Sequence, residues 1–130
     1  MYRCVRELTH RPMRDGSAVS NAHVPAFLAL EVAGYAWNDA LAEVSGGELT
    51  AADVVIVNID ANFSRELLVG EADFYVSLRR IGRTSFTLET SIGQGGTIAS
   101  VATFTVAYIR DGAPAPLSDR FIEFLRVLEV

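Results

Sequence analysis

The chain has 130 residues, of which 50% are hydrophobic and 21% are charged, and it carries a formal net charge of −5. This length fits one domain, residues 1–130, and the apolar content is enough for a core and argues against disorder. The negative charge excludes a surface that is basic throughout, so we expect no nucleic acid partner.

The first half of the chain predicts one strand and one long helix. Residues 2–10 (YRCVRELTH) can form a first strand, and residues 11–23 form a loop rich in Asp, Gly, Ser and Asn. Pro25 suits the first turn of a helix, where a missing N–H group costs no intrahelical bond, and Gly46 suits the helix end. Apolar residues nearly encircle the axis between them, so we expect a buried helix.

The hydrophobic period then changes to two, which predicts strands. Glycine-containing turns separate segments of this kind, as in antiparallel hairpins; the segments are 54–63, 72–81, 84–92 and 97–110. A final helix is predicted over roughly 117–127. One long apolar helix against one antiparallel sheet is an α+β layer architecture.

Other features indicate a bacterial, cytoplasmic protein without a membrane partner. All eleven cationic residues are arginine, which is typical of GC-rich genomes. The lone Cys4 cannot form an internal disulfide and suits a reducing compartment. The N-terminal MYRCVRELTHR is charged, unlike a signal peptide, and the longest apolar run, VPAFLALEVAGYAW, is too short to span a bilayer.

The order of the elements resembles the hotdog fold, in which an antiparallel sheet wraps one long central helix. The loop before the helix resembles that of 4-hydroxybenzoyl-CoA thioesterases, a family with the pattern D-x-D-x-x-G-H-x-N-N at this place. Asp15 matches the second Asp, and Asn21 lies six residues later, where the first Asn belongs. The segment IDANFSRELLVGEADFYVSLRRIGRTSF also resembles the strands and hairpin that follow in this family.

The loop departs from the family pattern at several positions. Met13 replaces the first Asp, Ala18 the Gly, Val19 the His, and Ala22 the second Asn. Some relatives also carry an apolar residue at the His position, so Val19 is compatible with the family.

The resemblance implies that this chain is an acyl-CoA thioesterase, an enzyme that hydrolyses an acyl thioester. That reaction needs an attacking oxygen and stabilisation of the carbonyl oxyanion. Asp15 would attack directly or activate water, and Asn21 would position its carboxylate. The backbone N–H groups and positive dipole at the helix start, residues Ala22, His23 and Val24, would bind the oxyanion. The alternative is that Asp15 only caps a turn.

Two more side chains near the helix start are candidates. A buried carboxylate such as Glu31 needs a partner or a purpose, and some hotdog thioesterases use a helix carboxylate as nucleophile or base. Its alternative role is an ion pair with an arginine at a subunit contact. His23 can polarise a carbonyl or act as a base, or be a capping or surface histidine. No His and carboxylate have metal-ligand spacing, so we expect neither a metal nor another cofactor.

Coenzyme A carries phosphates, which arginine binds well. Arg80 and Arg83 are the candidates for its nucleotide end, because Arg83 matches a phosphate-contacting position of the family. Thr84 and Ser85 would line the same tunnel. The alternative is that these arginines are solvated charges that protect a sheet edge.

The resemblance also implies self-association as a homodimer or homotetramer, because subunits of this fold join their sheets edge to edge around the site. Two other functions stay open. One is a non-enzymatic hotdog domain that binds an acyl ligand or serves in oligomerisation. The other is a hotdog dehydratase or hydratase that uses His23 with Glu31.

Overall fold

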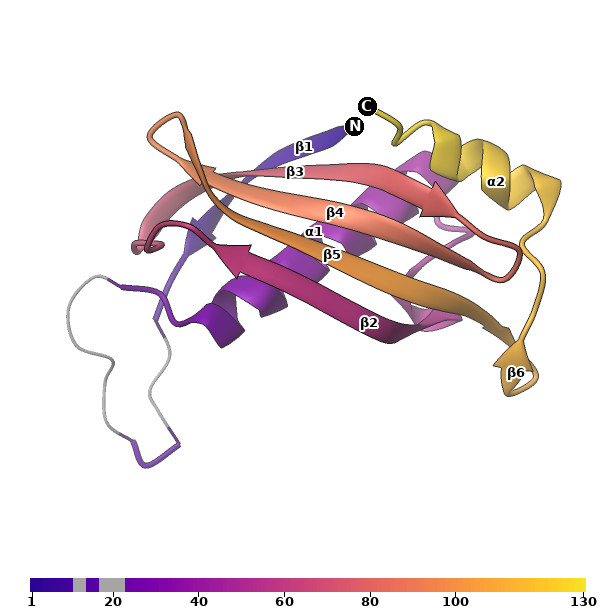
Figure 1. The fold of residues 1–130 in the computed structure, drawn as a ribbon, viewed down its shortest axis with the longest axis horizontal. Coiled ribbons are helices and arrows are strands. Elements are labelled where there is room, and N and C mark those ends of the chain that lie inside the picture. The colour runs from indigo at the N-terminus through magenta and orange to yellow at the C-terminus, as the bar shows by residue number, and fades with distance from the viewer. Residues whose placement is uncertain (11–13, 17–22) are drawn as a thin grey trace.

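The computed structural model describes residues 1–10, 14–16 and 23–130. Its strands and α-helices, shown in Figure 1, are β1 (Tyr2–Leu8), α1 (Ala26–Ser45), β2 (Val54–Phe63), β3 (Gly70–Ile81), β4 (Ser85–Gln94), β5 (Thr97–Arg110), β6 (Ala113–Pro114) and α2 (Asp119–Arg126). A 3-10 turn, η1 (Ala51–Asp53), precedes β2. None of the helices in this part of the chain is long and apolar enough to cross a membrane.

The main sheet is antiparallel and has the strand order β1-β3-β4-β5-β2, with the short β6 paired to β5. β1 and β2 are therefore the two opposite edges of this path of strands. Helix α1 packs on one face of this sheet, and α2 packs against α1 and β3 at one end (Figure 1). The expected α+β class is confirmed, with two helices, of 20 and 8 residues, in the described chain.

The ends of α1 follow the residues that favour them. Pro25 is the N-cap residue, and Gly46 is the C-cap residue in the left-handed conformation, with φ 61°. Glycine adopts this conformation without the steric cost that a Cβ atom brings. The N–H of Gly47 donates to Ala42 O at 2.8 Å, which satisfies one of the last carbonyl groups of the helix.

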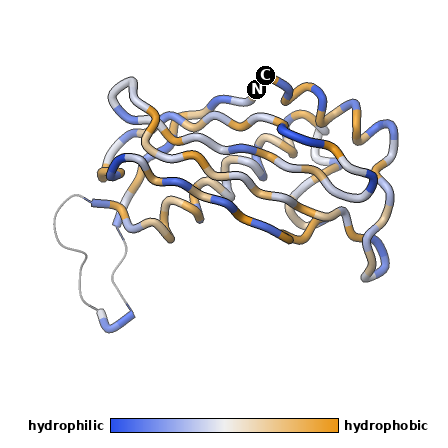
Figure 2. The backbone as a smooth tube through the Cα atoms, viewed as in Figure 1, coloured by the Kyte–Doolittle hydropathy of each residue, from blue (hydrophilic) through white to orange (hydrophobic). Residues whose placement is uncertain are grey.

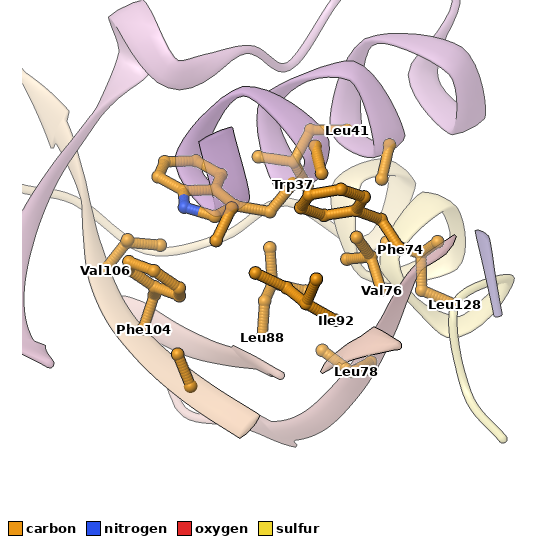
Figure 3. Packing of buried hydrophobic residues seen from close by; sticks show 14 of the residues in the cluster. Trp37, Leu41, Phe74, Val76, Leu78, Leu88, Ile92, Phe104, Val106 and Leu128 are labelled. Atoms are coloured by element: carbon orange, nitrogen blue, oxygen red, sulfur yellow. The ribbon is translucent and has the colours of Figure 1, made fainter. Parts of the chain in front are cut away.

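The core lies between α1 and the sheet. Alanines of α1 at 29, 33, 36 and 40 are at most 1% exposed, so the helix approaches the strands closely. Trp37 packs against Phe104 of β5 with ring centroids 6.0 Å apart. Figure 3 shows Trp37 and Leu41 of α1 above the side chains of the sheet that complete this cluster, among them Phe74, Leu88, Ile92 and Val106.

Thr90 places a hydroxyl in this core. It lies on the same face of β4 as Leu88 and Ile92 and is 0% exposed. Its Oγ1 has no hydrogen-bond partner among the described residues. A buried hydroxyl without a partner costs roughly 1–3 kcal/mol. We therefore expect Thr90→Val to raise the free energy of unfolding by about 1 kcal/mol, measured as a higher midpoint in urea.

The matched control is Thr87→Val, on the same strand. Thr87 Oγ1 lies 2.9 Å from Thr105 Oγ1, so this substitution removes a hydrogen bond that is made. We expect it to lower the free energy of unfolding by about 1 kcal/mol. A lower urea midpoint for Thr90→Val would contradict the assignment of Thr90 as an unsatisfied core hydroxyl.

Candidate functional site

A cavity of about 630 Å³ lies at the N-terminus of α1. This volume is within the range of small-molecule sites, roughly 300–1,000 Å³. Two segments form its wall: residues 23–27, which lead into α1, and residues 63–67, which begin at the end of β2. The apolar part of the lining consists of Val24, Pro25, Ala26, Phe27, Phe63 and Leu67. The polar part consists of His23, Ser64, Arg65 and Glu66.

The first turn of α1 leaves two backbone N–H groups at this cavity. The N–H groups of Leu28 and Ala29 both donate to Pro25 O, at 3.0 and 3.2 Å. Those of Ala26 and Phe27 come before them and have no acceptor among the residues that the structure describes. Both residues line the cavity. Free donors and the positive end of the helix dipole together favour a negative charge at this place.

These N–H groups differ from the ones that the sequence suggests. The N–H of Val24 donates to Leu67 O at 2.8 Å, so it is not available for an oxyanion. The expectation for Val24 is therefore wrong, because a strand-like contact with the opposite wall uses its donor. Ala22 lies outside the described residues. His23 lines the cavity, so it stays a candidate.

A contact between a histidine and a carboxylate joins the two walls of the cavity. His23 Nε2 lies 3.1 Å from Glu66 Oε2, and the two side chains are 45% and 71% exposed. Glu66 and the adjacent Arg65 also line a second cavity, of about 470 Å³, together with residues at the turn between β4 and β5. Sequence reasoning assigned no role to either residue. Both lie in the loop after β2, where charged residues are the ordinary expectation.

Asp15, the main catalytic candidate, lies in a turn formed by residues 14–16 and is exposed. Figure 1 draws this turn well away from the sheet. Asp15 is not among the residues that line either cavity described above. Asn21, which would position it, lies outside the described residues. The structure of one chain therefore does not bring Asp15 and the start of α1 together.

Glu31 is half-buried on α1. It follows Phe27 by four residues, so the two side chains lie on the same face of the helix. Phe27 lines the cavity and Glu31 does not. Glu31 is thus one helical turn away from the candidate site.

The expected coenzyme A residues lie at the opposite end of the sheet. Arg80 and Arg83 are exposed and Thr84 and Ser85 half-buried, at the turn between β3 and β4. The N–H of Tyr108 donates to Thr84 O at 2.8 Å.

The pairing of Tyr108 shows how far the turn between β3 and β4 lies from the cavity. Tyr108 pairs with Val54 at the start of β2, whereas Ser100 pairs with Phe63 at its end, beside the cavity. Eight residues of β5 separate Tyr108 from Ser100, which is roughly 26 Å of strand. One chain alone does not place these arginines at the cavity.

β2 is a long, exposed edge strand. It pairs with β5 and has no neighbour on its other side among the described strands. Figure 2 shows the hydrophobic start of this strand at the lower edge of the sheet. Its large apolar residues are between 40% and 59% exposed: Val55, Ile56, Val57, Ile59 and Phe63. An apolar edge with unpaired backbone groups is a template for another strand.

The layers, the strand order and the cavity at the start of α1 define an α+β protein of the hotdog type. The chain aligns with the thioesterase from Thermus thermophilus, solved with coenzyme A and zinc, at a TM-score of 0.82 and 22% identity, over 98% of this chain and 92% of that one. A predicted thioesterase from Bacillus stearothermophilus aligns at a TM-score of 0.80 and 19% identity, over 99% and 96%.

The 1,4-dihydroxy-2-naphthoyl-CoA thioesterase from Synechocystis is more distant in sequence. It aligns at a TM-score of 0.73 and 12% identity, over 95% of this chain and 94% of that chain. No model of a known family matches the sequence, and no curated protein matches it. The resemblance to hotdog thioesterases is therefore confirmed at the level of the fold.

Proposed function

We propose that this protein hydrolyses an acyl thioester, and specifically an acyl-CoA, at the cavity beside α1. The observation that carries the proposal is the combination found there: an apolar cavity of about 630 Å³ whose wall includes two N–H groups at a helix start. An apolar wall suits an acyl chain, and the N–H groups suit the oxyanion that forms when its carbonyl carbon is attacked. The shared fold with thioesterases supports the same reaction.

In this proposal the N–H groups of Ala26 and Phe27 stabilise the oxyanion. Asp15 does not line this cavity in the structure of one chain. We assign it the attack, as a nucleophile or as the base that activates water, because its loop resembles the loop of the thioesterases. Glu31, one helical turn from Phe27, is the second carboxylate for that role, or it forms an ion pair at a subunit contact. Asn21 would orient the carboxylate of Asp15.

We further propose that two copies join through β2 as a homodimer, which can pair into a tetramer. An added strand would satisfy the unpaired edge of β2 and cover its exposed apolar residues. If the two β2 strands run antiparallel, the Phe63 end of one copy lies beside the Val54 end of the other. The cavity of one copy then faces the turn between β3 and β4 of the second copy.

This arrangement would bring the arginines at the turn between β3 and β4 of the second copy towards the cavity. In the described sheet, β5 and β4 lie between β2 and β3. With strands about 4.8 Å apart, the Arg83 turn of the second copy would lie roughly 10–15 Å from the joined edge. That span suits an extended coenzyme A, with its acyl group in the cavity and its phosphates on Arg80 and Arg83 of the second copy.

The proposal is tested by measuring thiol release from a series of acyl-CoA substrates with short, long and aromatic acyl groups. We expect release well above the rate in buffer for at least one class. No release from any thioester, together with tight binding of acyl-CoA, would instead indicate an acyl-binding domain without hydrolase activity.

A further inference from the structure

Thioester hydrolysis ends with a thiolate that must take up a proton, and the cavity contains a group that can supply it. We propose that His23, oriented by Glu66, protonates the sulfur as the carbon–sulfur bond breaks. This inference rests on the proposed hydrolysis and adds a catalytic residue and a positioning residue to it.

His23 and Glu66 both belong to the wall of the cavity. Their side chains come from the two walls, and His23 Nε2 lies 3.1 Å from Glu66 Oε2. His23 is three residues before Ala26, whose N–H group is proposed to bind the carbonyl oxygen. In a thioester the carbonyl oxygen and the sulfur are bonded to the same carbon atom. A thioester whose oxygen is bound at the helix start therefore has its sulfur in the part of the cavity that His23 would face.

Glu66 is held in place by backbone hydrogen bonds on both sides of it. The N–H groups of Ser64 and Arg65 donate to Ala99 O at 2.9 and 3.2 Å. Leu67 O, directly after Glu66, accepts the N–H of Val24. The glutamate is thus presented from a fixed segment.

Gln94 fixes the same segment by two further hydrogen bonds. The carboxamide of Gln94, at the end of β4, makes both backbone hydrogen bonds of Leu68: its Oε1 accepts the N–H at 2.9 Å and its Nε2 donates to the carbonyl at 2.7 Å. A side-chain amide here takes the place of a neighbouring strand. A base or acid that is itself oriented by a third, fixed group is the usual arrangement in acyl-transfer sites.

Protons are conserved in the proposed hydrolysis. Water bonds to the acyl carbon while Asp15 takes its proton, and the oxyanion collapses with cleavage of the carbon–sulfur bond. The electron pair goes to sulfur, which takes the proton of His23. Asp15 then releases its proton to solvent, and His23 regains one from solvent, so that the products are the carboxylic acid and the free thiol.

The test varies the leaving group. A coenzyme A thiolate leaves poorly without a proton, whereas the thiolate of 5-thio-2-nitrobenzoate leaves readily because its thiol is more acidic. We expect His23→Gln to lower kcat for the acyl-CoA about a hundredfold. For the thioester of the same acyl group with 5-thio-2-nitrobenzoate, we expect kcat to fall less than about threefold. Each variant is compared with the wild type on the same substrate, so differences in binding between substrates cancel.

Glu66→Gln should show the same contrast with a smaller loss, about tenfold on acyl-CoA, and Glu66→Asp should recover part of it. The matched control is Glu48→Gln, whose carboxylate pairs with Arg120 outside the cavity; it should change neither rate. Equal losses on both substrates in His23→Gln, or no loss on either, would overturn the role of His23. Absence of hydrolysis in the wild type would instead refute the proposed function.

Discussion

Asp15→Asn is expected to lower kcat for acyl-CoA hydrolysis by about a hundredfold or more, because an amide neither attacks the carbonyl carbon nor takes a proton from water. The amide keeps the size and hydrogen-bonding shape of the side chain. Asp15 is exposed in the folded chain, so the melting temperature should stay within about 1 °C of the wild type. Rates of thiol release and thermal unfolding measure the two effects.

The matched control for Asp15→Asn is Asp111→Asn. Asp111 is also exposed and lies in a turn, between β5 and β6, with a positive φ of 52° that asparagine tolerates well. We expect this control to retain full activity. If Asp15→Asn hydrolyses acyl-CoA at the wild-type rate, Asp15 is not the catalyst, and Glu31→Gln becomes the variant to measure.

Val57→Lys is expected to convert the protein to a monomer and to lower its activity by more than tenfold. Val57 is 59% exposed on β2 and lies at the irregularity in the pairing with β5, between Ile56 and Asn58. A lysine on an edge strand opposes its pairing with a strand of another chain, and any burial of the charge at the joined edge adds a further cost. Light scattering after size-exclusion chromatography gives the mass, and thiol release gives the activity.

The matched control is Val127→Lys. Val127 is 65% exposed and follows α2, which packs against α1 and β3. The Val127→Lys substitution introduces the same charge at a surface valine, so it should change neither the mass in solution nor the activity. A Val57→Lys variant that keeps the wild-type mass would refute β2 as the contact between copies.

The strands and helices could be predicted from the sequence because their patterns are local. The segments 54–63 and 97–110 match β2 and β5 as observed, and the final helix was expected within two residues of each end of α2. The strand order could not be predicted in the same way. It depends on contacts between distant segments, such as Tyr2 with Val76, which no local pattern contains.

The candidate site was predictable only in part. The start of α1 was recognised, because proline before an apolar run marks a helix N-terminus. The sequence does not show which N–H groups are available for an oxyanion. The N–H of Val24 donates to the carbonyl oxygen of Leu67, more than forty residues later in the chain. Glu66 was missed for the same reason: its importance comes from contact with His23, and the two are distant in the sequence.

A structure with an acyl-CoA analogue that carries a methylene group between the carbonyl carbon and the sulfur tests the central claim most directly. We predict that its carbonyl oxygen accepts hydrogen bonds from Ala26 N and Phe27 N, with the carboxylate of Asp15 beside the carbonyl carbon. The phosphates should lie near Arg83 of a second copy. An analogue bound away from the start of α1, or Asp15 remote from its carbonyl carbon, would contradict the account.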